Sequence, residues 1–437
     1  MKEFIEVTLK GAVIMHQSYG KLIKLTRIEK NIKQEKLCEG ICTPSYLSRI
    51  ENDRVVADEQ VYKLLLQKLE VELNNDMINI EQIDSQIEIW YEQILMNKES
   101  SINVESLKEK ALTTNADTYL KFKLVYCRHL LISNQLEEVK KYISELEKSI
   151  PPFNKRLNFL FANVMIIFYY KNKQFLKAVE AGENFLPIRS SDSFVKPIEL
   201  GKFYYNLALA YKSSYQYEKS ILYGNQALDI FKEWYFLEFA LRCHVLLGIC
   251  YNNSQKYEQA FHSYKVAQEI IPLLPEKDYH YCIIDNNLGN CYENINDYKL
   301  SLQHYIKSYE NKENDDKMLS LVNIIRCCYK AGNLKQAQYW LEVAEKNIQP
   351  STSNKNIFQL KIFSVVLHNY DLPIEELKKL EEECIQFFTN EKLYNSIIFY
   401  SKVFAQLYNE RNLYKKVSEM YELALTATEE KISKQLQ

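Results

Sequence analysis

Residues 43–52 read TPSYLSRIEN and carry the local signals of a short amphipathic helix. Thr43 followed by Pro44 is typical of an N-cap and a first helical turn. The threonine hydroxyl accepts a backbone N–H, and proline lacks only an N–H that would be unpaired there. Leu47 and Ile50 lie three residues apart and so face inward together. The outward side of this predicted helix then carries Pro44, Ser45, Tyr46, Ser48 and Arg49.

The residues on either side of this helix predict a compact four-helix unit. Apolar residues at helical spacing predict a first helix that ends at Asn31, and Gln34 belongs to a second helix of two turns that Gly40 closes. A fourth helix is expected to begin at Ala57 or Asp58. The apolar faces of the first and fourth helices comprise Leu22, Ile23, Leu25 and Ile28, and Val61, Leu64, Leu65 and Leu69. The second and third helices follow one another at the spacing of a helix-turn-helix.

Residues 19–71 resemble the Cro/repressor-like helix-turn-helix family, in which a Gln opens the second helix and a Ser/Thr-capped third helix ends in an Arg-Ile-Glu-Asn-like run. The resemblance implies that double-stranded DNA is a partner. Gln34 would brace either a phosphate or the third helix. The implied base-reading side chains are Ser45, Tyr46 and Arg49, and the implied contacts to the DNA backbone come from Thr43, Ser48 and Arg54. Pro44, also on the expected DNA-binding face, departs from the family pattern, because many relatives carry a long polar side chain there.

The charge of the chain favours a local DNA-binding surface. The formal net charge is −2, whereas residues 19–56 carry eight basic and five acidic side chains. Because this small surplus neutralises only a few phosphates, we expect two units to bind as a symmetric dimer on a near-palindromic operator. Arg49 is the best candidate for base specificity, since a guanidinium donates two hydrogen bonds to guanine. The alternative is a unit that serves only protein interaction or dimerisation.

The composition of the chain predicts an all-α protein. Only 9 Gly and 9 Pro occur in 437 residues, which disfavours α/β enzyme folds with many glycine-rich turns. The 10 cysteines lack paired CxxC spacing and only 7 histidines accompany them. We therefore expect no metal site, no cofactor and no disulfide framework. The P-loop, HExxH and GxSxG motifs are missing, so we expect no enzyme, and without a signal-peptide layout or a membrane-length apolar run the expected location is the cytoplasm.

The remainder of the chain, residues 101–437, repeats one helical hairpin. Three copies are clearest, NLALAY at 206–211, LLGICY at 246–251 and NLGNCY at 287–292, and they lie 40 and 41 residues apart. Nine residues past each tyrosine comes a small residue, then Gly or Tyr, then Ala or Ser. These positions are Ser220, Gly224 and Ala227; Ala260, Tyr264 and Ala267; and Ser301, Tyr305 and Ser308. This is the tetratricopeptide pattern, and we expect seven or eight such hairpins stacked into a right-handed superhelix.

Amide and basic side chains recur on the first helices of these hairpins and would line the concave groove of the solenoid. A carboxamide can pair with both the N–H and the C=O of an extended peptide, so such a ladder predicts a peptide-binding groove. The expected peptide-binding residues are Asn163, Lys202, Asn206, Arg242, Asn287, Asn290 and Asn323. The alternative is that these asparagines are solvated or cap neighbouring groups, because the whole chain is rich in Asn.

The order of the parts resembles a known family over nearly the whole chain. An extension over residues 1–17 precedes the helix-turn-helix domain over 18–75, a linker helix over 76–100 and the repeat domain over 101–437. This order resembles the RRNPP family of quorum-sensing receptors, in particular its PlcR-like and NprR-like members. The resemblance implies a transcriptional regulator that binds a short imported signalling peptide in the groove and dimerises through the repeat domain. Whether peptide activates or relieves repression stays open.

Two other functions are compatible with the same pattern. Rap proteins use a similar repeat domain to bind and dephosphorylate response regulators, and such an activity would need acidic or Gln side chains near the linker, such as Glu81, Gln82 and Gln86. The third possibility is a scaffold that tethers a partner protein to DNA without responding to a peptide.

Overall fold

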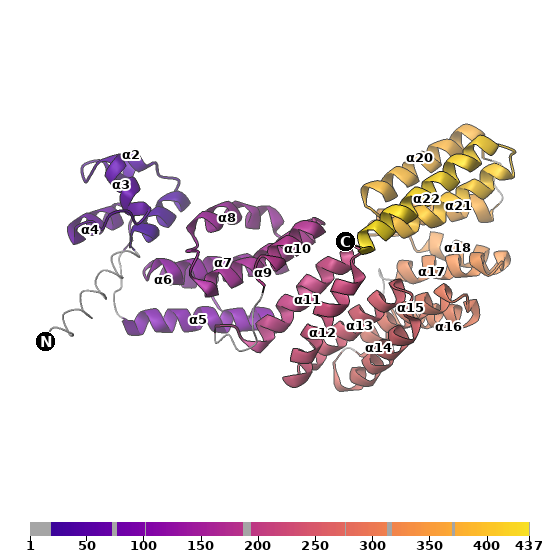
Figure 1. The fold of residues 1–437 in the computed structure, drawn as a ribbon, viewed down its shortest axis with the longest axis horizontal. Coiled ribbons are helices and arrows are strands. Elements are labelled where there is room, and N and C mark those ends of the chain that lie inside the picture. Colours follow the sequence, from indigo (N-terminus) through magenta and orange to yellow (C-terminus); the bar gives the residue numbers. More distant parts are fainter. Residues whose placement is uncertain are drawn as a thin grey trace. The chain divides into compact units, whose positions relative to one another are not determined.

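The structure is a computed structural model that describes residues 19–71, 77–100, 102–186, 194–275, 277–312, 317–368 and 372–436. Within these ranges every regular element is helical, so the predicted all-α class is confirmed (Figure 1). The chain divides into two compact units, residues 1–203 and 204–437, and the boundary falls inside helix α11. The extension expected over residues 1–17 lies outside the described residues.

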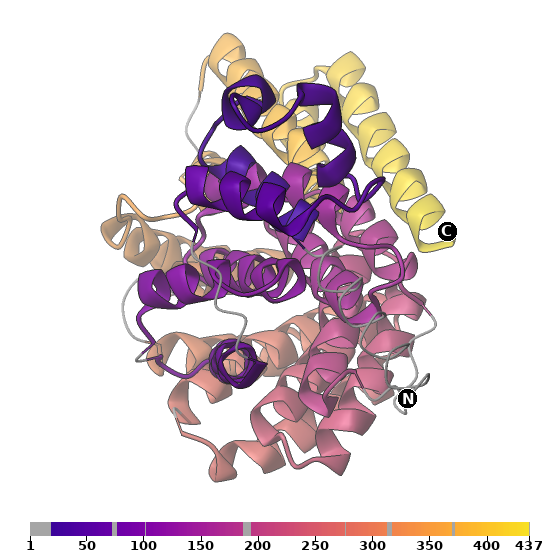
Figure 2. The ribbon, with the colours of Figure 1, turned by 90° about the vertical axis from the view of Figure 1, so that its left-hand side faces the viewer.

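Four short helices at the start of the first unit enclose a small core (indigo in Figure 2). They are the helix over residues 19–29, α2 (Gln34–Cys38), α3 (Pro44–Glu51) and α4 (Glu59–Lys68). Leu22, Leu47 and Ile50 are fully buried between them, as the sequence predicts. The inward assignment was wrong at two positions, since 38% of Ile28 and 42% of Leu64 is exposed. On α4 the apolar face is rotated, and Tyr62 and Leu66 are buried instead.

The ends of these helices follow the sequence signals. Thr43 is the N-cap of α3, and its hydroxyl accepts a hydrogen bond from the N–H of Tyr46 at 3.3 Å. Asn31 and Gly40 follow the first two helices with φ of +53° and +77°, the left-handed conformation of a helix C-terminus. Gly20 is required for a different reason, because a Cβ atom there would lie 2.2 Å from the carbonyl oxygen of Ile50. The first helix therefore packs directly on the backbone of α3.

The rest of the first unit consists of a long helix and two helical hairpins with a short helix between them. The helices are α5 (Met77–Leu95), α6 (Val104–Leu112), α7 (Ala116–Ile132), α8 (Leu136–Ser149), α9 (Lys155–Lys171) and α10 (Phe175–Glu183). Helix α5 packs along α7, and its Ile87 and Trp90 are fully buried. Trp90 packs against Phe122 and His129 of α7. Helix α5 thus forms part of the packed unit.

The second unit is built from antiparallel helix pairs. They are α11 (Pro197–Ser213) with α12 (Tyr217–Glu233), α13 (Leu237–Asn253) with α14 (Tyr257–Ile270), α15 (Lys277–Asn294) with α16 (Tyr298–Glu310), α17 (Lys317–Lys330) with α18 (Leu334–Lys346), α19 (Asn354–Leu367) with α20 (Ile374–Asn390), and α21 (Tyr394–Asn409) with α22 (Tyr414–Leu436). A short 3-10 helix, Ile271–Leu273, follows α14. The first α11 residues, up to Phe203, belong to the first unit.

Small residues of the repeat pattern sit where two helices of a hairpin meet. A Cβ atom on Gly248 of α13 would lie 2.5 Å from the ring of Tyr264 of α14, and one on Gly289 of α15 would lie 2.6 Å from the ring of Tyr305 of α16. Both tyrosine side chains are fully buried. The glycines are therefore needed because a large aromatic ring fills the space that a side chain would occupy.

Candidate nucleic-acid interface and ligand cavity

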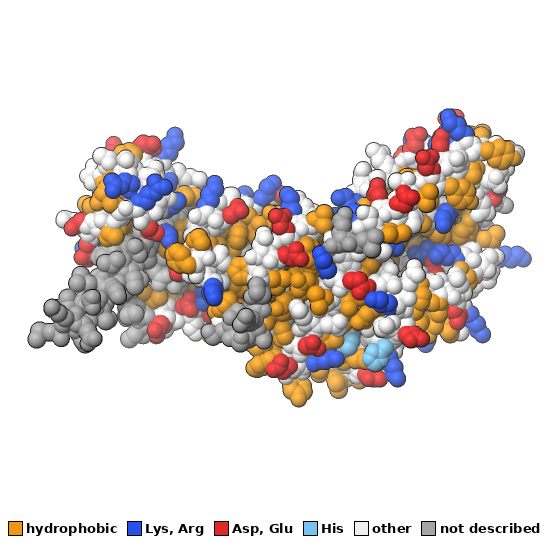
Figure 3. Space-filling view, viewed as in Figure 1, with side chains coloured by type: hydrophobic (Ala, Val, Ile, Leu, Met, Phe, Trp, Pro, Cys, Tyr) orange, Lys and Arg blue, Asp and Glu red, His pale blue; other side chains and the backbone are white. Residues whose placement is uncertain are grey.

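The outward face of α3 presents the side chains that the sequence predicts for DNA contact. Ser45, Arg49 and Arg54 are exposed, and Pro44 and the capping Thr43 are exposed at the start of the helix. The three remaining candidates, Gln34, Tyr46 and Ser48, are half-buried. Within the described residues neither Arg49 nor Arg54 makes an ion pair. Figure 3 shows Lys and Arg side chains gathered on this four-helix unit. The arginines of α3 and the following turn are thus available to an anionic partner.

A buried carboxylate fixes the end of α3. Glu51 is 1% exposed and accepts hydrogen bonds from Arg27 Nε at 2.6 Å, Arg27 Nη2 at 2.8 Å and Gln34 Nε2 at 2.7 Å. Arg27 also donates to the carbonyl of Ile32. The Gln34 side chain therefore contacts α3 through Glu51, and its role in DNA binding stays a prediction. Arg27 was not singled out from the sequence, because it is one of three basic residues on the first helix, with Lys21 and Lys24.

The helix-turn-helix also contacts the first helices of the repeat domain through Glu29. This carboxylate pairs with Lys108 of α6 at 2.6 Å and with Lys123 of α7 at 3.5 Å, and it accepts a hydrogen bond from the Tyr119 hydroxyl. Burial raises the pKa of Glu29, but the hydrogen bond from Lys108 and the charge of Lys123 outweigh it, so the pKa is lowered overall. The ionised form of Glu29 is thereby favoured.

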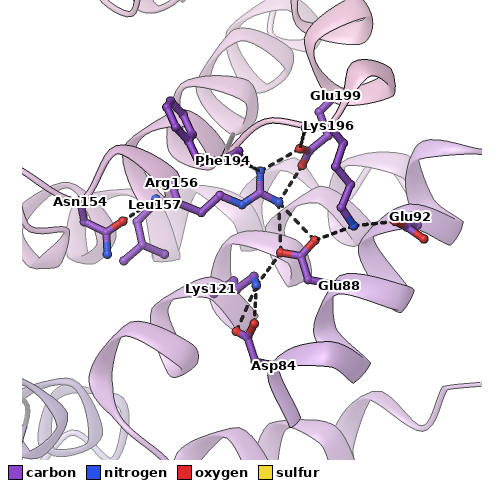
Figure 4. Close-up of polar contacts among 10 residues, drawn as sticks. All are labelled: Asp84, Glu88, Glu92, Lys121, Asn154, Arg156, Leu157, Phe194, Lys196 and Glu199. Carbon is purple, nitrogen blue, oxygen red and sulfur yellow. Dashed lines mark hydrogen bonds and ion pairs between the residues drawn. The ribbon is translucent and has the colours of Figure 1, made fainter. Parts of the chain in front are cut away.

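A network of charges joins α5 to α7, α9 and the start of α11 (Figure 4). Glu88 of α5 pairs with Lys121 of α7 at 2.5 Å and with Arg156 of α9 at 3.1 Å. Arg156 also pairs with Glu199 of α11 at 2.8 Å, and Lys196 reaches Glu88 at 3.3 Å. Burial opposes ionisation, yet Arg156, Lys121 and Lys196 lower the pKa of Glu88 to about 2. The network therefore holds α5 in a fixed position on the hairpins.

The second unit contains a cavity of about 270 Å³ between the first helices of three successive hairpins, α11, α13 and α15. Its wall is mainly apolar, with Leu209, Val245 and Ile249 among the lining residues. Lys212 and Arg242 add two positive charges, and the lining includes no acidic residue. Arg242 contacts Glu238 at 2.5 Å on its own helix, but 43% of its side chain is exposed. The cavity fits a ligand that combines apolar groups with a carboxylate.

Of the residues predicted to bind peptide, Arg242 lines this cavity and the others lie elsewhere. Asn206 of α11 is half-buried and next to the lining residue Tyr205. In the first unit, Lys202 donates to the carbonyl of Leu95, and Asn163 of α9 donates to the carbonyl of Phe159 one turn earlier. In the second unit, Asn287 likewise donates to Ile283, Asn290 accepts from Asn252, and Asn323 donates to Asn286 while accepting from Arg326. Four of these amides thus bond to the protein itself, Asn163 and Asn287 within their own helices and Asn290 and Asn323 across neighbouring first helices.

The first unit contains a buried arginine, Arg128, that was not among the residues predicted from the sequence. Arg128 of α7 is 8% exposed, and its Nε has no hydrogen-bond partner within the described residues. Burial lowers the pKa of Arg128. The pKa of Lys171 on α9 is lowered by burial and by the nearby charge of Arg128. An arginine in the middle of a helix gives no sequence signal of burial, so only the packing reveals this positive site.

Other site types receive no support from the structure. In the described ranges, no group of three His, Cys, Asp or Glu side chains could hold a metal ion. All ten cysteines are free. No helix in the described part is long and apolar enough to cross a membrane.

The chain is similar to a curated protein over most of its length. A helix-turn-helix model matches residues 23–74. The transcriptional activator NprA of Geobacillus stearothermophilus is 25% identical over 400 residues, which are 89% of this chain and 98% of the activator. The predicted resemblance to the RRNPP family is confirmed. Response regulator aspartate phosphatase I of Bacillus subtilis (strain 168) is 25% identical over 256 residues, 54% of this chain and 63% of the phosphatase.

Solved structures share the fold that the RRNPP resemblance predicts. The apo form of the quorum sensor NprR from B. thuringiensis superposes with a TM-score of 0.61 at 14% identity, over 80% of this chain and 99% of NprR. NprR in complex with its cognate peptide NprX gives a TM-score of 0.57 at 16% identity, over 79% of this chain and 99% of that one. The predicted fold, a helix-turn-helix followed by a tetratricopeptide-like helical body, is confirmed.

Proposed function

We propose that this protein is a cytoplasmic, peptide-responsive transcriptional regulator. A short signalling peptide binds in the cavity between α11, α13 and α15, and a dimer of the chain binds a near-palindromic operator through the outward face of α3. The observation that carries the proposal is the cavity, because its apolar wall and two cations suit a peptide with apolar side chains and a carboxylate. In support, the NprR fold has been solved with a bound cognate peptide.

Peptide and DNA binding are coupled when the peptide prefers one arrangement of the helices over another. The contacts of Glu29 with Lys108 and Lys123 offer a physical connection from the DNA-binding unit to α6 and α7. The α5 network extends this connection to α9 and α11. A differential affinity of roughly 1–3 kcal/mol is enough to change operator occupancy between about fivefold and 150-fold.

The proposed peptide binding is tested by affinity selection of a randomised synthetic heptapeptide library on the full chain. Selected peptides are expected to raise the melting temperature of the wild-type protein. Arg242→Ala removes a cation of the cavity and is expected to weaken the selected peptides about tenfold or more. Lys335→Ala removes an exposed cation of α18 and serves as the control. Failure to select any peptide, or equal loss in both variants, would overturn this half of the proposal.

The proposed DNA binding is tested by selection of binding sites from randomised DNA duplexes. The wild-type chain is expected to enrich a near-palindrome, and Arg49→Ala is expected to weaken its binding to that site by about 1–3 kcal/mol and to relax specificity at one base pair of each half-site. Lys63→Ala removes an exposed cation from α4 and leaves α3 unchanged. If Arg49→Ala binds the selected site as tightly as the wild type, the assignment of α3 is wrong.

An exposed surface of α5 favours a second function, the removal of phosphate from a response regulator. Glu81, Gln82 and Gln86 all lie exposed on α5, whereas Ile83 and Ile87 are buried. One relative of this chain is named a response regulator aspartate phosphatase. The test is phosphate loss from a receiver domain phosphorylated with acetyl phosphate. Faster loss with the wild type than with Gln86→Ala would support phosphatase activity, and the wild type's failure to accelerate the loss would exclude it for that substrate.

A further inference from the structure

Helix α7 buries three cations, and one of them lacks a counter-charge. Lys121 pairs with two carboxylates of α5, at 2.9 and 2.5 Å. Lys123 pairs with Glu29 at 3.5 Å and with Glu145 at 2.8 Å. Arg128 is buried as deeply as Lys121, since 8% of each is exposed. Among the described residues, however, Arg128 makes no ion pair, and its Nε has no hydrogen-bond partner. The described part of the chain therefore leaves the charge of this guanidinium uncompensated.

An unpaired guanidinium in the interior is unfavourable, because burial takes water from a charge and no protein acceptor replaces it. Arginine stays protonated at neutral pH, so Arg128 cannot avoid this cost by losing its proton. Burial lowers the pKa of Arg128, and Tyr91 of α5 is the one group among the described residues that acts against it. An arginine near a helix end can also donate to the carbonyls of the last turn. Arg128 lies one turn before the end of α7 at Ile132, yet its Nε makes no such bond.

The neighbours of Arg128 on α5 and α9 supply further hydrogen-bond donors, and α7 packs against both helices. Lys171 is the last residue of α9 and donates to Asn134, two residues past the end of α7, at 3.3 Å. Its ammonium group therefore lies at the same end of α7 as Arg128. Burial and the charge of Arg128 both lower the pKa of Lys171, as expected for two cations close together. Tyr91 is 1% exposed and adds a hydroxyl. Three helices thus bring together two cations and a hydroxyl.

This set of donors suits an oxyanion. The planar guanidinium of Arg128 donates two parallel hydrogen bonds to a carboxylate or a phosphate, and an ammonium adds a point charge. A phosphate monoester carries a charge between about −1.5 and −2 at neutral pH. Two cations without an acidic neighbour match that charge better than they match the single charge of a carboxylate. A phosphate group would thus supply the counter-charge that Arg128 lacks.

We propose that Arg128 is the centre of a phosphate-binding site at the junction of α5, α7 and α9, with Lys171 and Tyr91 as further donors. Because only 8% of Arg128 is exposed, the site admits a small ligand, either inorganic phosphate or the phosphate group of a small ester. None of the three residues lines the peptide cavity of the second unit, so the inference goes beyond the proposed function. Bound phosphate would strengthen the same junction of helices that the Glu88 network holds together.

The first experiment measures binding of radiolabelled inorganic phosphate to the full chain by equilibrium dialysis at neutral pH. The wild type is expected to show a single saturable site per chain. Arg128→Met keeps the bulk of the side chain without its charge and is expected to raise the dissociation constant at least about tenfold. Lys171→Ala is expected to weaken binding as well. Lys335→Ala is the matched control, because Lys335 is an exposed lysine of α18, and it is expected to leave the constant unchanged.

The second experiment separates a lost site from a damaged fold by thermal melting. In phosphate-free buffer, Arg128→Met is expected to melt at the temperature of the wild type or above it, because the uncompensated charge is gone. Phosphate is expected to raise the melting temperature of the wild type with saturation, and that of the variant only by the general effect of an excluded salt. If Arg128→Met melts lower, Arg128→Lys replaces it in the dialysis. That variant keeps the charge but loses the planar fork, and it is expected to bind phosphate about tenfold more weakly.

The source of the phosphate is distinguished by competition with the radiolabelled ion. Phenyl phosphate that displaces it at lower concentrations than unlabelled phosphate would assign the site to a phosphate ester, and the opposite order would assign it to the inorganic ion. Acetate that competes as well as phosphate would make the site a carboxylate site and overturn the phosphate assignment.

Hydrogen exchange locates the bound ion. Phosphate is expected to protect amides in the last turns of α7 and α9 in the wild type, and to leave those of α18 unchanged. Phosphate uptake without saturation, equal affinity in the wild type and the Arg128 variant, or protection that is absent from α7 and α9 would each overturn the phosphate site. A chain that binds phosphate and selects neither peptide nor DNA would contradict the proposed function and leave the phosphate site intact.

Discussion

Glu88 is the acidic centre of the network that holds α5 on the hairpins, and its removal is expected to loosen that helix. Its side chain is 20% exposed and contacts Lys121, Arg156 and Lys196. Glu88→Gln preserves shape and removes the charge. Because partly buried cations then lose their shared counter-charge, the substitution should destabilise the packing of α5.

The magnitude follows from the pKa of Glu88, which falls from 4.5 to about 2 in the folded protein. Each unit corresponds to about 1.36 kcal/mol, so the ionised carboxylate stabilises the fold by about 3 kcal/mol, or about 2 kcal/mol after allowance for its exposed fraction. Since the folded pKa is depressed, this stability is fully present above about pH 4.5 and is lost as the pH falls toward 2.

Hydrogen exchange of the α5 amides measures this effect directly, because it reports the free energy of local opening. At pH 7, Glu88→Gln is expected to lower the opening free energy of α5 by about 2–3 kcal/mol. The difference should stay constant down to about pH 5, where Glu88 is still ionised. Glu92→Gln is the control, since 49% of that side chain is exposed and, among the described residues, it forms an ion pair only with Lys196. A loss below about 0.5 kcal/mol, or one equal to that of the control, would refute the reasoning.

Three further substitutions test the packing. Gly20→Ala is expected to destabilise the helix-turn-helix by about 1–3 kcal/mol in denaturant unfolding, because the new Cβ meets the carbonyl oxygen of Ile50, and an unchanged midpoint would contradict that close approach. Gly289→Ala should lower the melting temperature of the full chain through its clash with the Tyr305 ring, and equal melting would show that the ring can move. Arg128→Met is expected to raise stability by about 1–3 kcal/mol in denaturant unfolding, since it removes a buried cation whose Nε lacks a partner within the described residues. Lower stability would indicate a structural role for this arginine.

Local sequence signals predicted the helix-turn-helix well. The N-cap at Thr43, the left-handed residues Asn31 and Gly40, and the inward Leu47 and Ile50 depend only on neighbours along the chain, so they could be derived without tertiary contacts. The exposed positions of Ile28 and Leu64 could not be derived. The apolar stripe of a helix is wide, so some of its residues lie at the edge of the face that packs on other helices. The angle at which the helices cross determines whether these edge residues are buried or exposed.

The proposed ligand site was harder to predict than the fold. Repeat spacing placed Arg242 and the asparagines on the first helices of the hairpins, and Arg242 does line the cavity. Spacing alone could not show that Asn290 and Asn323 bond to amides of neighbouring helices, because a carboxamide pairs equally well with protein or ligand. The predicted domain boundaries and site assignments stay predictions until binding is measured.

The sequence by itself determined the all-α class, the helix-turn-helix and the repeat, since these follow from periodicity, capping residues and the small-residue positions that recur about every 40 residues. Only the tertiary structure determined which charged side chains pair and which are buried. Only in the folded chain is Glu51 buried between Arg27 and Gln34, Glu88 paired with Lys121, Arg156 and Lys196, and Arg128 buried with no partner for its Nε among the described residues. The physical reason is that periodicity fixes which face of a helix is apolar, whereas the pairing of charges depends on distances between residues far apart in the chain.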